Sequence, residues 1–200
     1  MTKIIVATNN EGKLKEINHS FTDIKNIEFI SLKKYPQMPE IIEDGKTLEE
    51  NAIKKARETA LFTKKIALAD DTGLEVDALG SAPGVFSARY AGENATYDDN
   101  NNKLLEELKN IEYKKRTACF KTVMALVFPD GKVFRVEGKC DGIILRDKKG
   151  TNGFGYDPLF FVPEKNKTFG EMYLEEKNLV SHRARALKGM KEVLKKLVFD

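Results

Sequence analysis

The chain has 200 residues, of which 41% are hydrophobic and 32% are charged, and its formal net charge at pH 7 is +3. This composition is typical of a globular protein of one domain, and so small a net charge does not by itself indicate nucleic-acid binding. No apolar run reaches about 18 residues, the length that spans a membrane, so we do not expect a membrane protein. Because the net charge is small, we do not expect a nucleic-acid-binding protein either.

The two cysteines and the N-terminal stretch bear on the cellular compartment. Cys119 and Cys140 lack the spacing of metal ligands, which favours reduced thiols. The first ten residues lack the apolar segment and the cleavage site of a secretory signal. We therefore expect a cytoplasmic protein.

The first half of the chain alternates apolar runs with amphipathic segments. The run at 3–8 is β-branched and ends at two asparagines, which is typical of a buried strand followed by a turn. Thr47 and Glu50 have the spacing of a capping box, and alanines follow at helical spacing. The sequence predicts strands at 3–8 and 27–32, a strand within 65–73 that ends in two aspartates, and helices at 13–21, 47–62 and 96–110.

The second half of the chain begins with a hairpin signal. The tetrapeptide Pro-Asp-Gly-Lys at 129–132 separates two long runs with strand character, 116–128 and 132–145. A further strand is expected at 159–163 and an amphipathic helix at 181–197. Strands with helices between them, followed by a meander, indicate an α/β fold with a mixed sheet. No linker-like stretch divides the chain, so residues 1–200 are expected to form a single domain.

Residues 8–13, with the sequence TNNEGK, form a candidate anion site at the passage from strand to helix. Backbone N–H groups and the positive end of the helix converge there, and Lys13 adds a cation. The stretch is not a Walker A loop, because its first glycine is missing and Leu14 stands where Ser or Thr would hold magnesium. The alternative is an ordinary turn with a solvated lysine.

Asp70 and Asp71 follow a buried run, at the strand end where open α/β sheets bind ligands. Two adjacent carboxylates repel each other unless a cation or a basic group lies nearby. Magnesium typically takes one or two protein carboxylates together with substrate phosphates, so a metal is one such cation. Glu43, just before the second helix, is a candidate second ligand, and solvated loop carboxylates are the alternative.

From the helical pattern, Lys54 and Lys55 are expected to face water.

Two further stretches are unusual for their positions. In GFGYDP, residues 153–158, the ring of Phe154 stands between two glycines, and the alternatives are a ligand-binding loop and a tight turn around a buried ring. Arg183 near the start of the last helix has the wrong charge for the helix dipole, which favours a ligand role. The neighbouring His182 could be an ordinary polar residue of the first turn. The lysines of that helix have no aromatic residues among them and indicate a solvated face.

Five stretches, in this order along the chain, resemble the motif series of the inosine triphosphate pyrophosphatase family, the non-canonical purine nucleotide pyrophosphatases. They are TNNEGK, EENAIKKA, ADDTGLEVDALGSAPGVFSARYAG, GTNGFGYDPLFF and EEKNLVSHRARAL. The resemblance extends from about residue 4 to about residue 195. Asn9 stands where members often have glycine, and we expect the turn to survive because asparagine tolerates the left-handed region. Thr72 replaces a common serine and keeps the hydroxyl group.

The resemblance implies a fold and a reaction. The fold would be an elongated mixed β-sheet flanked by helices, with two lobes and a deep central cleft. The reaction would be Mg²⁺-dependent hydrolysis of inosine, deoxyinosine and xanthosine triphosphates to the monophosphate and pyrophosphate, which cleanses the nucleotide pool. The family is typically homodimeric, and no nucleic-acid or membrane partner is implied.

The same resemblance implies roles for individual residues. Asp71 would accept the proton of the attacking water, Lys55 would add a charge at the phosphates, and Glu43 and Asp71 would hold magnesium. Phe154 would stack on a purine, and Asp157 would orient its neighbours. The implied substrate-binding residues are Thr8, Asn9, Asn10, Glu11, Gly12, Lys13, Thr72, Phe154, Gly155, Tyr156, Asp157, Lys177, His182 and Arg183.

Two other functions remain open at this point. One is a related pyrophosphatase that acts on standard or modified pyrimidine nucleotides. The other is a nucleotide-binding regulator without turnover, which the presence of all the candidate metal ligands and phosphate-side lysines disfavours.

Overall fold

The structure is a computed structural model that describes residues 1–198. The chain divides into two compact units, each assembled from separate stretches. Unit 1 consists of Met1–Asp71, Thr122–Gly138 and Ala184–Asp200, and unit 2 consists of Thr72–Lys121 and Lys139–Arg183. Every boundary falls inside a strand or a helix, which is why the composition of the chain shows no linker.

The predicted α/β class with a mixed sheet is confirmed. Eight strands form one sheet in the order β2-β1-β3-β5-β6-β7-β8, with β4 paired to β3. The pairs β1–β2 and β1–β3 are parallel, whereas β3–β4, β6–β7 and β7–β8 are antiparallel. The strands are β1 Thr2–Val6, β2 Ile27–Ser31, β3 Ile66–Val76, β4 Pro83–Gly84, β5 Thr117–Val127, β6 Val133–Ile144, β7 Phe160–Val162 and β8 Lys167–Thr168.

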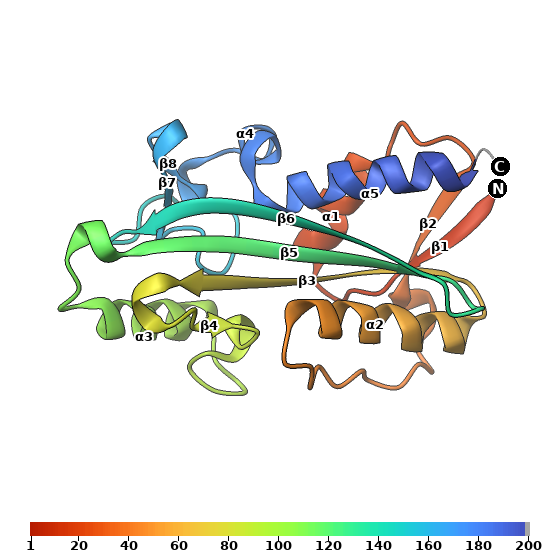
Figure 1. The fold of residues 1–200 in the computed structure, drawn as a ribbon, viewed down its shortest axis with the longest axis horizontal. Coiled ribbons are helices and arrows are strands. Elements are labelled where there is room, and N and C mark those ends of the chain that lie inside the picture. Colours follow the sequence, from red (N-terminus) through yellow and green to blue (C-terminus); the bar gives the residue numbers. More distant parts are fainter. Residues whose placement is uncertain (199–200) are drawn as a thin grey trace. The chain divides into compact units, whose positions relative to one another are not determined.

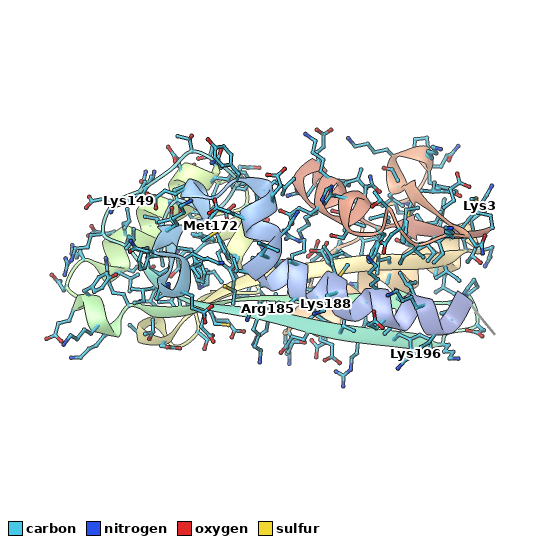
Figure 2. The ribbon with its side chains drawn as sticks, turned by 90° about the horizontal axis from the view of Figure 1, so that it is seen from above. Lys3, Lys149, Met172, Arg185, Lys188 and Lys196 are labelled. Carbon is cyan, nitrogen blue, oxygen red and sulfur yellow. The ribbon has the colours of Figure 1, made fainter. Side chains whose placement is uncertain are left out.

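In unit 1, helices cover both faces of the strands. Helix α2, Leu48–Thr63, lies on one face, and α1, Glu11–Ser20, and α5, His182–Val198, lie on the other (Figure 1). The alanines of α2 at 52, 56 and 60 are at most 1% exposed, as their helical spacing predicts. A second apolar set packs α1 and α5 onto the strands and includes Ile4, Val6, Ile17, Leu68, Leu187, Met190 and Leu194. Lys188 and Lys196, labelled in Figure 2, are exposed residues of α5, as predicted.

Unit 2 has its own core and two helices. Helix α3, Tyr97–Leu108, begins with a capping box between Thr96 and Asp99. Helix α4, Leu174–Val180, has seven residues and was not predicted, because two turns are too short for a periodic signal. The core is rich in aromatic rings: Phe160 lies 4.6 Å from Phe120 and 5.0 Å from Phe169, between ring centroids.

Two local predictions were wrong. Strand β3 does not end at Asp70 and Asp71 but continues to Val76. Its apolar positions continue past the aspartates, since the side chains of Leu74 and Val76 are fully buried. The capping box of α2 is incomplete: Thr47 accepts from the Glu50 amide, but the Glu50 carboxylate accepts from the amide of residue 46.

Within residues 1–198, no helix is both long enough and apolar enough to span a bilayer.

Candidate functional site

The turn between β1 and α1 is held by two of its own side chains. Asn10 caps the helix: its Oδ1 accepts from the Lys13 amide at 3.1 Å. Thr8 Oγ1 accepts from the Asn10 amide at 3.2 Å. The first turn of a helix leaves N–H groups without helical partners, so the amides at Glu11 and Gly12 suit an anion. Residues 8–13 therefore have the local geometry expected of an anion site.

Two members of this turn, Asn9 and Glu11, are exposed. Asn9 is exposed and, among the described residues, is not one of those with positive φ, so this turn needs no left-handed residue there. The carboxylate of Glu11 is exposed and pairs with Lys33 at 2.8 Å. Glu11 thus has its backbone amide, rather than its side chain, to offer to an anion.

Asp70 forms an ion pair with Lys13 of the turn between β1 and α1. The Lys13 ammonium lies 3.0 Å from Asp70 Oδ2, and the Asp70 side chain is fully buried. Successive side chains of a strand point to opposite faces, so Asp70 faces α1 while Asp71 faces α2. Each aspartate thus has a lysine ammonium within 3.0 Å on its own face of the strand, which offsets the repulsion that their adjacency suggested.

Asp71 lies at the centre of a buried polar group on the α2 side. Lys55 Nζ is 3.0 Å from Asp71 Oδ1 and 3.0 Å from Glu43 Oε2. Asn51 Nδ2 donates to Asp71 Oδ2 at 3.3 Å, and Asn51 Oδ1 accepts from the Gly45 amide at 2.8 Å. Lys55 is only 9% exposed, so the expectation that it faces water was wrong. Its position four residues after Asn51 places both side chains on one helix face.

Asp70 and Asp71 lie just beyond the parallel pairing of β1, β2 and β3. Val6, the last residue of β1, pairs with Leu68 of β3 and with Ser31 of β2. Asp70 and Asp71 follow directly after that register ends. Although β3 itself continues, the aspartates thus occupy the edge at which parallel strands bind ligands.

We call Lys13, Glu43, Lys55, Asp70 and Asp71 the carboxylate–lysine cluster. Its three carboxylates face two ammonium groups, which leaves one negative charge in excess. Burial raises the pKa of Asp71 above its ordinary value, although the two lysines act in the opposite direction. Burial would lower the pKa of Lys55, but the three carboxylates outweigh it and raise that pKa. The aspartates and Lys55 are buried while Glu43 is partly exposed, and a cluster in which carboxylates outnumber lysines is suited to a further cation.

The donor set fits a magnesium ion that also binds a substrate. Glu43 and Asp71 lie close enough to share the Lys55 ammonium, so their hard oxygens can serve one cation. Among residues 1–198 there is no group of three or more His, Cys, Asp or Glu side chains arranged to hold a metal. Magnesium commonly completes its octahedral shell with phosphate oxygens and water, so a pair of carboxylates suffices.

In unit 2, the GFGYDP loop is built around Asp157. Its Oδ2 accepts from the Phe154 amide at 2.8 Å and lies 2.7 Å from Lys177 Nζ. Gly153 has φ +78°, and a Cβ there would lie 2.0 Å from that same oxygen. Glycine is therefore required at 153 by both the backbone and the space. Tyr156 is buried and donates from its hydroxyl to the Ser87 carbonyl at 2.9 Å.

Two cations lie at the ring of Phe154. Lys177, which α4 supplies, has its Nζ 5.2 Å from the ring centroid, and the Arg183 guanidinium carbon lies 5.6 Å from it. Arg183 Nη2 donates to Thr72 Oγ1 at 3.1 Å, and Arg183 is 1% exposed. We call Thr72, Phe154, Asp157, Lys177 and Arg183 the aromatic–cation cluster. A half-buried ring with two cations over it can hold a flat, electron-rich ligand.

His182 belongs to the core of unit 2 rather than to a solvated first turn. Its ring is 3% exposed and stacks on Phe120, with centroids 4.6 Å apart and an interplanar angle of 13°. This packing fixes the start of α5 and therefore the position of Arg183. Contact between His182 and a substrate stays a prediction.

The structure adds residues that the sequence did not single out. Asn51 braces Asp71, as described above. Asn101 of α3 donates to the Gly155 carbonyl at 3.0 Å. The Ser87 hydroxyl accepts a hydrogen bond from the Leu74 amide at 2.9 Å, and the Ser87 carbonyl accepts one from the Tyr156 hydroxyl. The only sequence signal was the placement of Asn51 and Ser87 inside the family motifs.

The predicted site residues form two sets, and every residue of the first set precedes every residue of the second in the chain. Those up to Asp71 belong to unit 1 and include the carboxylate–lysine cluster, and those from Thr72 onward belong to unit 2 and include the aromatic–cation cluster. The peptide bond from Asp71 to Thr72 joins one set to the other.

Comparison with known proteins gives consistent results over nearly the whole chain. Residues 4–193 match the sequence model of the Ham1 family. A protein named dITP/XTP pyrophosphatase from Geobacter sulfurreducens is 53% identical over 97% of this chain and 97% of its own. One of the same name from Desulforamulus reducens is 49% identical over 98% of this chain and 96% of its own.

Solved structures agree. A HAM1 protein from Coxiella burnetii has a TM-score of 0.91 and 43% identity, covering 98% of this chain and 100% of its own. A nucleoside-triphosphatase, also named dITP/XTP pyrophosphatase, from Mycobacterium abscessus has a TM-score of 0.79 and 42% identity, covering 94% and 98%. These matches confirm the resemblance carried by the five motifs, and the chain belongs to the Ham1 family.

Proposed function

We propose that this chain hydrolyses the triphosphates of inosine, deoxyinosine and xanthosine to the monophosphate and pyrophosphate. The observation that carries the proposal is the carboxylate–lysine cluster, in which Lys55 lies 3.0 Å from both Glu43 and Asp71. It combines cations for phosphates, hard oxygens for a metal and a candidate base in one cluster. The relatives that are about half identical over nearly their full length carry the name dITP/XTP pyrophosphatase.

The triphosphate end of the substrate is assigned to unit 1. The start of α1 offers amides and Lys13, and Lys55 adds a second ammonium. Because Asp70 and Asp71 hold these lysines at 3.0 Å, the two charges are fixed before the substrate arrives. Preorganised cations of this kind stabilise charge that develops on a phosphoryl group without further reorganisation.

Magnesium is assigned to Glu43 and Asp71. When bound, the ion would neutralise phosphate oxygens and help to orient the triphosphate. The excess negative charge of the carboxylate–lysine cluster supports a divalent cation there.

The hydrolytic step is assigned to Asp71. Its carboxylate removes a proton from a water molecule, whose oxygen bonds to the α-phosphorus while the bond to the bridging oxygen of pyrophosphate breaks. Asn51 and Lys55 donate to the two carboxylate oxygens and so fix the orientation of the base. Lys13 and Lys55 are assigned to the β- and γ-phosphates, whose own anhydride bond stays intact, so they leave together as pyrophosphate.

The base is assigned to unit 2. Phe154 provides a stacking surface, and the Lys177 ammonium and the Arg183 guanidinium lie over its ring. A 6-keto oxygen, as in inosine and xanthosine, accepts hydrogen bonds from such donors, whereas the 6-amino group of adenosine cannot. Each buried donor left without an acceptor costs about 1–3 kcal/mol. Two donors that ATP leaves without an acceptor would favour inosine triphosphate over ATP by about 10²- to 10⁴-fold in kcat/KM.

The proposal extends to assembly and location. We place the protein in the cytoplasm, where nucleoside triphosphates are made and used, and we propose a homodimer, as the family resemblance implies. Residues 8–13 and the GFGYDP loop are assigned to the nucleotide substrate and to no nucleic acid.

A nucleotide panel with magnesium tests this function. The wild-type protein should release pyrophosphate from inosine, deoxyinosine and xanthosine triphosphates well ahead of ATP. Arg183→Ala should narrow that gap and weaken binding. Preference for pyrimidine triphosphates would instead favour the related pyrophosphatase, and binding without pyrophosphate release would favour a regulator.

A further inference from the structure

One face of helix α3 contacts the GFGYDP loop at two points. Tyr97 and Asn101 are four residues apart, so their side chains lie on the same face of the helix. The Tyr97 ring lies 6.2 Å from the ring of Phe154, between centroids, and Asn101 Nδ2 donates to the Gly155 carbonyl at 3.0 Å. Neither residue has a role in the function proposed above.

The loop needs such a brace because glycines flank the ring. Gly153 has φ +78° and Gly155 has φ +61°, and glycine restricts the backbone less than any other residue. On the N-terminal side of the ring, Asp157 accepts from the Phe154 amide at 2.8 Å. On the C-terminal side, the Gly155 carbonyl is held by Asn101. Asp157 thus holds the 153–154 peptide group through its carboxylate and the Phe154 carbonyl through its amide, at 3.3 Å. Asn101 holds the 155–156 peptide group, so the backbone that carries the Phe154 ring is restrained on both sides.

The neighbouring asparagines of α3 have different partners. Asn100 holds the preceding loop, since its Oδ1 accepts from the Ala91 amide and its Nδ2 donates to the Ala88 carbonyl. Asn102 is exposed and accepts from Lys148 at 3.2 Å. Asn101, 2% exposed, is thus the asparagine of this run that reaches the GFGYDP loop.

We propose that Asn101, assisted by Tyr97, is a positioning residue for base binding that acts by fixing the ring of Phe154. This inference rests on the proposed function, in which Phe154 stacks on the purine. Loss of the Asn101 hydrogen bond would let residues 153–155 sample other conformations, which binding would then have to restrict. Fixing the backbone of about one residue corresponds to about 5- to 30-fold in an equilibrium constant.

The test compares alanine variants at 97, 101 and 102. Two quantities are measured for each: the equilibrium Kd for inosine monophosphate and kcat for inosine triphosphate. Asn101→Ala should raise the Kd about 10-fold, while kcat stays within about twofold. Tyr97→Ala should raise the Kd about 3-fold and Tyr97→Phe should not, because the ring contact is kept. Asn102→Ala, the same substitution one position along the helix, should match the wild type.

A purely structural role would give a different pattern. If Asn101 only stabilised the fold, Asn101→Ala would lower the folded fraction and the maximal rate but leave the Kd of the folded protein unchanged, and that result would overturn the inference. An equal loss of affinity in Asn102→Ala would overturn it as well. Should Asn101→Ala fail to fold, Tyr97→Ala decides, since Tyr97 is 51% exposed, and a wild-type Kd there counts against the inference.

The wild-type measurement separates this inference from the function on which it rests. Turnover by the wild type with no effect of the variants would reject the positioning role alone. No turnover of inosine triphosphate by the wild type would reject the proposed function, and the positioning role with it.

Discussion

The ion pair beneath Phe154 allows a sharp test of how the aromatic–cation cluster is held. Asp157 Oδ2 lies 2.7 Å from Lys177 Nζ, and the two side chains are 4% and 6% exposed. Asp157→Asn keeps the shape and an oxygen for the Phe154 amide but removes the negative charge that Lys177 faces. The ammonium group would then be buried beside a neutral amide.

The structure sets the size of the effect. Removing one partner of a buried ion pair costs about 3–5 kcal/mol. Because asparagine retains an acceptor, we expect the lower end, about 3 kcal/mol. In a protein of this length, about 1 kcal/mol corresponds to about 2–4 °C in Tm, so Asp157→Asn should lower Tm by about 6–12 °C.

Helix α4 offers a matched control. Glu176, next to Lys177, pairs with Lys167 at the same 2.7 Å, but these side chains are 39% and 42% exposed. Water screens an exposed pair, so Glu176→Gln should change Tm far less than Asp157→Asn does. Thermal unfolding followed by circular dichroism measures both variants. Equal losses in the two would refute the argument that burial gives the Asp157–Lys177 pair its importance.

Three further predictions concern other parts of the chain. Asp71→Asn should lower kcat for inosine triphosphate by about 10²-fold or more while the protein stays folded; near-wild-type turnover would remove Asp71 from the mechanism. Burial and a neighbouring carboxylate raise the pKa of Cys119 to about 12. Iodoacetamide at pH 8 should therefore label it about 10²-fold more slowly than a cysteine of the unfolded chain, and equal rates would contradict this. Gly153→Ala should lower Tm more than Gly155→Ala, because both positions have positive φ but only a Cβ at Gly153 meets Asp157; equal losses would show that the contact is unimportant.

The sequence predicted those elements whose periodicity extends over several turns or residues. The alanine stripe of α2, the apolar face of α5 and the hairpin of β5 and β6 all appear where the pattern placed them. Their burial repeats at every turn or at every second residue, so it is visible without any knowledge of the partners. Helix α4 has seven residues and gives no such repeat.

The course of β3 could not be predicted from local chemistry. Two adjacent aspartates normally end a buried strand, because a buried charge is costly. Here Lys13 and Lys55 approach from helices on opposite faces, and each neutralises one carboxylate. The strand therefore continues through Asp70 and Asp71, and the reason lies in residues that are distant in sequence.

The candidate site shows the same limit. The family motifs identified Asp71, Lys55 and Phe154, but pattern alone placed Lys55 in solvent. Asn51 and Asn101 give no periodic signal in the sequence, because they hydrogen-bond to Asp71 of β3 and to Gly155, which are 20 and 54 residues away in the chain. Only the folded chain reveals such contacts.

The most direct test of the central claim is the fate of the oxygen from water. Hydrolysis of inosine triphosphate is run with magnesium in water labelled with heavy oxygen, and the products are analysed by mass spectrometry. If water attacks the α-phosphorus with Asp71 as the base, the label appears in inosine monophosphate, and the released pyrophosphate carries none. Label in pyrophosphate, or release of orthophosphate with inosine diphosphate, would contradict the proposed mechanism.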